Sequence, residues 1–299
     1  MKIDAVFSGG GVKAYAFLGA LEEIYGANLT IKRVAGTSAG AILASFLAAG
    51  YSLIEIERHL KYLNLKKLLD PPRLVSIIPG SKWIFLYFQM GLYRGKKLES
   101  WIEHILAEKG IHTFGDLKSD DLKVVASDLT LGRLVVIPDD LERLYGMKPE
   151  TFSVAKAVRM SAGFPFFFMP DRIYGKRGTV SIIVDGGLLS NFPLWIFDQN
   201  KANSKTLKRP VLGVKLSESV EQTQPKKIKH ALDLFLALFA TMKQAHDARY
   251  ISKDHERHII FIPVHEVEAI DFNLSHKTIE ELKKKGKYYA RNFLKSWPH

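Results

Sequence analysis

The chain has 299 residues, 47% of them hydrophobic, which is enough for one large α/β domain and too apolar for a disordered protein. It contains no cysteine, which excludes disulfides, thiolate nucleophiles and thiolate metal sites. The formal charge of +12 favours anionic partners, either nucleic acid or an acidic membrane surface, although solvated helix faces explain such an excess equally well.

The first fifty residues alternate twice between a strand and a helix. A short β run over residues 2–8 ends in glycines, and the helical pattern that follows closes at Gly26. A second strand over 29–36 precedes a helix over 39–50. This order predicts an α/β fold with a mostly parallel central sheet and helices on both faces.

The rest of the chain continues this pattern with one interruption at residues 71–95, where prolines, glycines and aromatic side chains are dense. No repeat or linker divides the chain, so we expect a single domain. The further expected elements are a helix over 53–69, a helix over 96–110, a strand pair over 122–129 and 132–138, a helix over 151–163 capped by Thr151 or Ser153, strands over 179–187 and 209–216, a long helix over 226–254, a strand over 257–264 and a last helix over 275–295.

The segment "GTSAG" places Ser38 between a strand and a helix, with glycine two residues before and two residues after it. Small flanking residues allow a sharp turn that leaves the serine hydroxyl accessible. The start of the following helix favours a developing negative charge at the same point. The alternative interpretation is an ordinary turn with a serine at the helix N-cap.

The segment "SGGGVKAYAFLG" joins the first strand to its helix, and amides in such a loop can hold a phosphate or an oxyanion. Gly9, Gly11 and Ala14 also fit the dinucleotide pattern G-x-G-x-x-A. That pattern expects an acidic residue near the end of the second strand, where this chain has Lys32 and Arg33. Basic residues at that place suit only a dinucleotide with a 2′-phosphate. Dinucleotide binding is therefore a weaker interpretation of this loop than an oxyanion or phosphate site.

Asp185 ends a buried strand and precedes two glycines in "IIVDGG". A carboxylate at a strand end faces the crevice where α/β sheets bind ligands, although Asp-Gly-Gly is also strong turn chemistry. With Ser38 and the glycine loop it completes a nucleophile, a base and oxyanion donors for acyl transfer. No histidine occupies a glycine-marked strand end, so we favour a direct Ser38–Asp185 dyad over a triad; the histidines considered are His246, His255, His258 and His265.

The segments "SGGGVKAYAFLGAL", "GTSAG" and "DGG", in this order, resemble the patatin-like phospholipase family. "ASDLTLGR" and "VRMSAGFPFFFMP" resemble two further segments of that family. The resemblance covers residues 4–198, and we expect residues 199–299 to add strands and helices that complete the same domain. Lys13 and Ala14 stand where the family often has arginine and glycine.

The resemblance implies a three-layer α/β sandwich and a lipid acyl hydrolase of the phospholipase A or lysophospholipase type. It implies Ser38 as nucleophile, Asp185 as general base and the amides of Gly9, Gly10 and Gly11 as the oxyanion hole, with no cofactor and no metal. Two alternatives remain open: an acyltransferase with a thioester donor, and a catalytically silent lipid-binding effector on the same scaffold.

The expected partner is a phospholipid or another lipid ester, not a specific nucleic acid, and no feature sets the oligomeric state. Aromatic residues in 71–95 suit a lid at a membrane interface, whereas 164–170 fit core packing. The N-terminus lacks an apolar signal core, and the longest apolar stretch, 39–51, is shorter than a membrane span. We therefore expect a cytoplasmic protein with peripheral contact at an anionic membrane.

Overall fold

The computed structural model describes residues 1–61, 63–72, 86–197, 209–217, 228–250 and 256–297. Most of the predicted lid segment, residues 71–95, therefore lies outside the described residues. Within the described residues, no helix combines the length and the apolar character that crossing a membrane requires.

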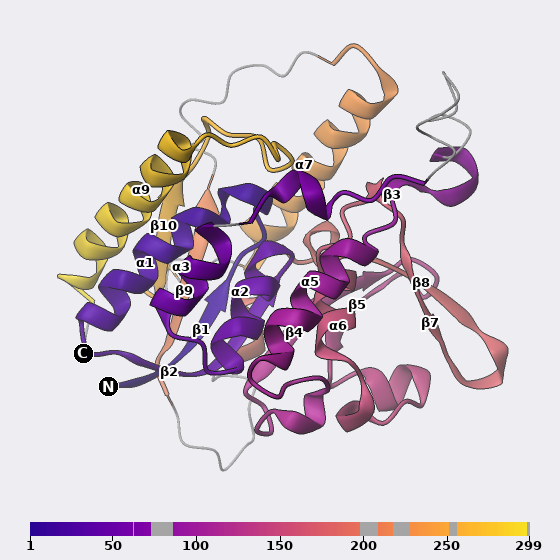
Figure 1. The fold of residues 1–299 in the computed structure, drawn as a ribbon, viewed down its shortest axis with the longest axis horizontal. Helices are drawn as coiled ribbons and strands as arrows, with labels where there is room; N and C mark the ends of the chain where they lie inside the picture. Colours follow the sequence, from indigo (N-terminus) through magenta and orange to yellow (C-terminus); the bar gives the residue numbers. More distant parts are fainter. Residues whose placement is uncertain (62, 73–85, 198–208, 218–227, 251–255, 298–299) are drawn as a thin grey trace.

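An eight-stranded sheet forms the centre of the molecule, in the order β10-β9-β1-β2-β4-β8-β7 with β5 paired to β4 (Figure 1). The run from β10 to β4 is parallel, whereas β5, β7 and β8 pair antiparallel. The predicted mostly parallel α/β sheet is thus confirmed. The strands are β1 Lys2–Phe7, β2 Thr30–Thr37, β4 Leu122–Asp128, β5 Arg133–Ile137, β7 Asp171–Tyr174, β8 Val180–Asp185, β9 Val211–Ser217 and β10 Ile259–Pro263.

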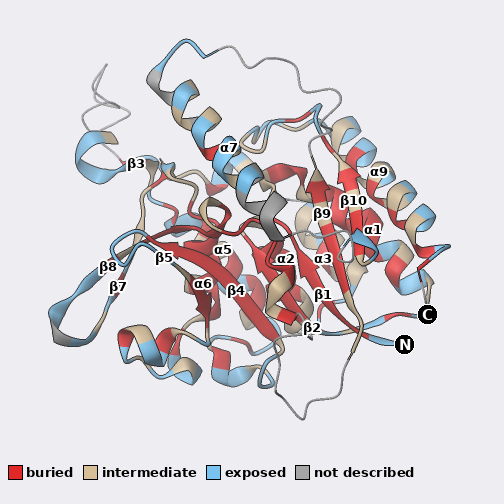
Figure 2. Cartoon of the chain, turned by 180° about the vertical axis from the view of Figure 1, so that it is seen from behind, coloured by how far each residue is buried: buried red, intermediate tan, exposed pale blue. Residues whose placement is uncertain are grey.

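Helices cover the two faces of this sheet unequally. The large core lies on one face, beneath α1, α2, α5, α6 and α9 (Figure 1). The other face carries a smaller cluster of buried apolar side chains beneath a short 3₁₀ helix. Helix α7 crosses this face near the upper end of the sheet as drawn in Figure 2. The helices are α1 Tyr15–Gly26, α2 Ala39–Ala48, α3 Leu53–Lys61, α5 Lys96–Ala107, α6 Val154–Ser161, α7 Ala231–Tyr250 and α9 His276–Leu294.

Shorter helical turns connect these elements. The 3₁₀ turns are η1 Gly11–Ala14, η2 Leu65–Leu68, η4 Phe114–Asp116, η6 Pro149–Thr151, η7 Lys176–Gly178, η8 Gly186–Leu188 and η9 Leu194–Phe197, and a π-helical turn, η5, spans Leu141–Tyr145.

Strand β1 at the sheet centre is buried on both faces, and its one buried charge, Asp4, is paired with Arg33 and Arg209. Ile3, Ala5 and Phe7 point into the large core, and Val6 points into the smaller cluster on the other face. A central parallel strand packs against the core on both faces, so apolar residues of both orientations are needed along it.

The structure differs from the predicted elements at several places. The sequence did not predict strand β7 of the main sheet or the π-helical turn η5. The expected helix over 53–69 is wrong: α3 ends at Lys61 and η2 begins after Asn64, whose side chain accepts a 3.1 Å hydrogen bond from the amide of Lys66. The sequence also did not predict a small parallel sheet of β3, Gly91–Tyr93, and β6, Phe166–Phe168. Three-residue strands are too short to show a period.

Candidate active site

The turn after β2 holds Ser38 in a backbone conformation that few residues adopt. Its φ of 55° and ψ of −123° lie outside the usual regions for a residue with a side chain, and only tight surroundings maintain them. A Cβ at Gly36 would lie 2.4 Å from the carbonyl oxygen of Gly40, and a Cβ at Gly40 would lie 2.4 Å from that of Phe7. Both glycines are therefore needed where β2, α2 and β1 pack at this turn.

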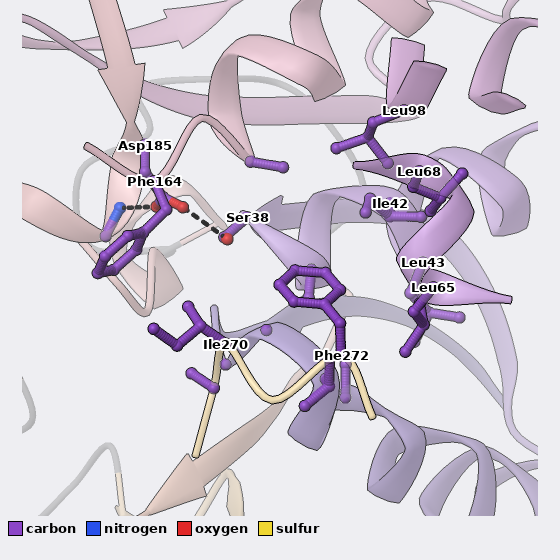
Figure 3. Close-up of a pocket in the computed structure, with 18 of the residues that line it drawn as sticks. Ser38, Ile42, Leu43, Leu65, Leu68, Leu98, Phe164, Asp185, Ile270 and Phe272 are labelled. Atoms are coloured by element: carbon purple, nitrogen blue, oxygen red, sulfur yellow. Dashed lines mark hydrogen bonds between the residues drawn. The ribbon is translucent and has the colours of Figure 1, made fainter. Parts of the chain in front are cut away.

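Strands β2 and β8 meet end to end along β4, which brings Ser38 to Asp185. Thr37 at the end of β2 is paired with Val125, and Asp185 at the end of β8 is paired with the next residue, Ala126. Because β2 runs parallel to β4 and β8 runs antiparallel, their carboxyl ends face each other. Ser38 Oγ donates a 2.7 Å hydrogen bond to Asp185 Oδ2 (Figure 3).

The Asp185 carboxylate is almost completely buried, with 3% of the residue exposed. Its Oδ1 accepts a 2.7 Å hydrogen bond from the amide of Gly187. Burial raises the pKa of Asp185 to about 6, against the opposing effects of the Ser38 and Gly187 hydrogen bonds and of the positive charge of Lys243. Such a pKa lies closer to neutrality than that of an ordinary aspartate, as a general base requires.

The glycine loop after β1 lies directly against Ser38. A Cβ at Gly9 would come within 3.2 Å of Ser38 Cβ, and Gly11 has a φ of +56°, which favours glycine. The amide of Gly9 donates a 2.9 Å hydrogen bond to the carbonyl of Asn191. In the described part of the chain, the amides of Gly10 and Gly11 have no such backbone acceptor, and both residues line the same cavity as Ser38.

A cavity of about 180 Å³ opens beside Ser38 and is lined mostly by apolar side chains. Figure 3 shows leucines of α2, η2 and α5 on one side of Ser38, with Phe164, Asp185 and Ile270 on the other. Besides the aromatic residues Tyr15 and Trp101, the lining residues with polar side chains are Ser38, Asp185, Asn191 and Lys243. The cavity therefore combines an apolar chamber with one nucleophile-and-base pair and one cation.

The model of the patatin-like phospholipase family matches residues 5–198, which is more than half of the chain. The chain belongs to this family. This patatin-like protein is similar to protein YqhO of Bacillus subtilis (strain 168), with 46% identity over 299 residues and the full length of both chains. It is also similar to a protein of Acanthamoeba polyphaga mimivirus, with 28% identity over 93% of this chain and 89% of the relative.

Two solved structures share the patatin-like fold at low sequence identity. VipD from Legionella pneumophila has a TM-score of 0.57 and 18% identity, over 99% of this chain and 67% of VipD. ExoU in its complex with SpcU, from Pseudomonas aeruginosa, has a TM-score of 0.52 and 17% identity over 98% of this chain. The present chain spans about half the length of that ExoU chain, 51%.

Two polar residues of this patatin-like site were missed by the sequence reasoning. Ser161 Oγ accepts a 2.9 Å hydrogen bond from the amide of Ser38 and donates a 2.6 Å hydrogen bond to the carbonyl of Val125, so it ties the turn to β4. Asn191 lines the cavity, and its buried side-chain nitrogen has no hydrogen-bond partner among the described residues. Ser161 lies in "VRMSAGFPFFFMP", a segment that resembles the family, so a signal for it was available. Asn191 lies beyond the "DGG" motif, and no motif marked it.

Of the residues that the alternatives to a direct dyad require, those that the structure describes lie away from the cavity. His258 accepts a hydrogen bond from the Trp297 indole, and His265 pairs with Glu266; neither histidine lines the cavity. The side chains of His246 and His255 lie outside the described residues. Arg33, the candidate for a cofactor 2′-phosphate, donates a 3.0 Å hydrogen bond to buried Asp4.

The two residues that depart from the family pattern are well accommodated. Lys13 is buried within η1, and Ala14 lines the cavity just before α1 begins. Among the described residues, no group of three histidine, aspartate or glutamate side chains has the arrangement of metal ligands.

Proposed function

We propose that the protein is a lipid acyl hydrolase that cleaves carboxylic esters of phospholipids or lysophospholipids. The observation that carries this proposal is the 2.7 Å hydrogen bond from Ser38 Oγ to buried Asp185 Oδ2 beside a largely apolar cavity. A serine hydroxyl bonded to a carboxylate is an activated nucleophile, and an apolar chamber suits an acyl chain.

In the first half-reaction, Ser38 Oγ attacks the ester carbonyl carbon while its proton passes to Asp185. The carbonyl oxygen becomes an oxyanion, and the amides of Gly10 and Gly11 stabilise it. The amide of Gly9 is left out of this set because it already donates to the carbonyl of Asn191. Removing one oxyanion donor typically lowers kcat by about 100- to 1,000-fold.

Collapse of the tetrahedral intermediate breaks the ester C–O bond, and the leaving alcohol takes its proton from Asp185. Asp185 then removes a proton from water, which attacks the acyl-enzyme and releases the fatty acid and the Ser38 hydroxyl. The raised pKa of about 6 serves both steps, because the carboxylate is ionised near neutrality and still holds a proton long enough to return it.

Asn191 contributes a further polar contact to the reacting ester in this proposal. A Cβ at Gly9 would come within 2.5 Å of Asn191 Oδ1, so the side chain lies against the glycine loop. A buried amide nitrogen without a partner is rare in folded proteins and is explained here by a substrate atom that completes its hydrogen bond.

The acyl chain occupies the leucine-lined side of the cavity. The leaving group faces Asp185, which is close enough to Lys243 for that charge to lower its pKa. A cation at that position suits the phosphate of a phospholipid headgroup. A substrate held in a bilayer requires contact between the protein and the membrane surface, and the net charge of +12 favours an anionic one.

The test is labelling with a fluorophosphonate probe, followed by peptide mapping, on the wild type, Ser38→Ala and Asp185→Asn. We expect label on Ser38 in the wild type, none in Ser38→Ala and slower labelling in Asp185→Asn. Unlabelled wild-type protein is then assayed against a panel of phospholipids, and the lipids that it hydrolyses identify the ester. Label on a different serine, or no label on folded protein supplied with vesicles, would refute the mechanism.

A further inference from the structure

Helix α7 exposes a stripe of apolar side chains that no described residue covers. Leu234, Leu238 and Met242 follow one another at intervals of four residues, which places them on one side of the helix, and they are 49%, 54% and 48% exposed. Large apolar side chains scattered singly need no explanation, but a row of three on one helix face indicates an interaction surface.

The adjacent side of α7 belongs to the active-site cavity. Phe235 packs on Phe166 with ring centroids 4.5 Å apart, and Phe239 packs on Phe164 at 4.7 Å. Phe239 and Lys243 line the cavity beside Ser38 and Asp185. One helix therefore carries the exposed stripe and part of the cavity wall, so whatever covers the stripe lies next to the substrate site.

A second exposed apolar group adjoins α7 through Phe166. Tyr87 and Phe88 are 80% and 74% exposed, and they precede β3, which pairs with β6 at Phe166. Met90 and Phe166 both have positive φ angles, 57° and 63°, an uncommon and unfavourable conformation for bulky side chains. In Figures 1 and 2, α7 and β3 lie along the same edge of the molecule.

Basic residues border both elements of this edge. Arg94 and Lys97 follow β3, Lys229 precedes α7, and Lys243 lies near its middle. Among the carboxylates nearby, Asp70 and Asp233 accept backbone amide hydrogen bonds at the starts of α5 and α7, and Glu99 pairs with Lys96. Asp171 lies close enough to Arg159 for their charges to interact. An apolar surface bordered by cations is complementary to an anionic bilayer, in which acyl chains lie beneath negative headgroups.

We propose that Tyr87, Phe88, Phe166, Leu234, Leu238 and Met242 form a docking face that inserts into the surface of an anionic lipid bilayer. This inference rests on the proposed lipid hydrolase function and assigns the surface through which the substrate is reached. Docking places the cavity wall formed by Phe239 and Lys243 at the headgroup level, so that a lipid passes into the cavity without crossing water.

The experiment measures sedimentation with vesicles of phosphatidylglycerol and phosphatidylcholine, in a Ser38→Ala background that prevents turnover. The test variant carries Leu238→Ser, Leu234→Ser and Met242→Ser. The matched control carries Leu129→Ser, Leu131→Ser and Tyr174→Ser, which are exposed to a similar degree at two hairpins and do not line the cavity. Thermal unfolding of each variant establishes that it is folded.

We expect the test variant to lose about tenfold or more in vesicle partitioning, because three apolar side chains no longer transfer from water into the bilayer. The control variant should bind as the parent does, and pure phosphatidylcholine vesicles should bind the parent less. In the catalytically intact background, the ratio of vesicle hydrolysis to hydrolysis of a dispersed short-chain ester should fall in the test variant alone.

The docking face would be refuted if the parent protein did not bind anionic vesicles, or if the test variant bound them as well as the parent does. It would also be refuted if the hairpin control lost binding and the test variant did not. A fourth contrary result is a wild-type dimer that dissociates in the test variant while vesicle binding is unchanged. The last result would make the stripe an interface between two copies. If fluorophosphonate fails to label Ser38 while the test variant still loses vesicle binding, the docking face stands and the proposed catalysis falls.

Discussion

Replacing Asp185 by asparagine should abolish turnover and stabilise the folded protein at neutral pH. The carboxylate has a pKa of about 6 in the folded protein, raised by burial from its ordinary value of 3.8. The folded chain therefore holds a proton between about pH 4 and pH 6 that the unfolded chain has released. In that window the free energy of unfolding falls as the pH rises, and the loss is complete above about pH 6.

The magnitude follows from the two pKa values. A difference of about 2.2 corresponds to about 3 kcal/mol of destabilisation at pH 7 and above, of which about 1.4 kcal/mol develops between pH 5.0 and pH 7.5. Asparagine has the same shape and no charge, and its oxygen can still accept the hydrogen bond from Gly187. The asparagine amide nitrogen cannot accept the hydrogen bond that Ser38 Oγ donates to Asp185, and this loss offsets part of the gain. The net gain in the free energy of unfolding should therefore be on the order of 1–3 kcal/mol.

The assay is urea unfolding followed by tryptophan fluorescence, at pH 5.0 and pH 7.5, for the wild type and Asp185→Asn. Asp116→Asn is the matched control, because amide donors of His112 and Thr113 hold the pKa of that exposed carboxyl below its usual range. Its stabilising effect is present at neutral pH and lost on acidification, so the control should be destabilised at pH 7.5. A gap between Asp185→Asn and the wild type that is absent or independent of pH would refute the reasoning.

Three further substitutions test the rest of the site. Lys243→Met removes a positive charge that lowers the pKa of Asp185, so the acid limb of kcat/KM, near pH 6 in the wild type, should move to higher pH. Ser161→Ala leaves the amide of Ser38 without its acceptor, and we expect a loss of about 1–3 kcal/mol in urea unfolding and a larger fall in kcat than rise in KM. Asn191→Leu removes a buried amide nitrogen that has no partner among the described residues, so unfolding should show equal or greater stability while steady-state turnover of the ester falls at least tenfold. Unchanged turnover would remove Asn191 from the mechanism.

Much of the fold follows from short-range features of the sequence. The strand-turn-helix repeat of the first fifty residues, the hairpin of β4 and β5 and the cap of α6 by Ser153 all depend on local residues, and Ser153 accepts the amide hydrogen bond of Lys156 at 3.2 Å. The two glycines around Ser38 were predicted to permit a sharp turn. Their surroundings give the reason, since backbone oxygens occupy the space that a Cβ would need.

Other features depend on contacts that no short segment contains. The break between α3 and η2 interrupts a continuous helical pattern, and only a cap by the single residue Asn64 marks it. The small sheet of β3 and β6 joins residues 91–93 to 166–168, with three residues in each strand. Phe164 and Phe166, expected to be core residues, instead pack on α7 beside the cavity, because that helix arrives from a distant part of the chain.

The orientation of β8 is what assembles the site, and strand patterns alone do not carry it. Had β8 run parallel to β4 in the same place, its first residue, Val180, would face the end of β2, and Asp185 would lie at the far end of the strand, about 17 Å away for a strand of this length. The antiparallel pairing of Asp185 with Ala126, next to the pairing of Thr37 with Val125, puts the carboxylate one residue from the serine turn. The sequence motifs therefore identify Ser38 and Asp185 as candidate site residues. The direction of β8 determines that their side chains are in contact.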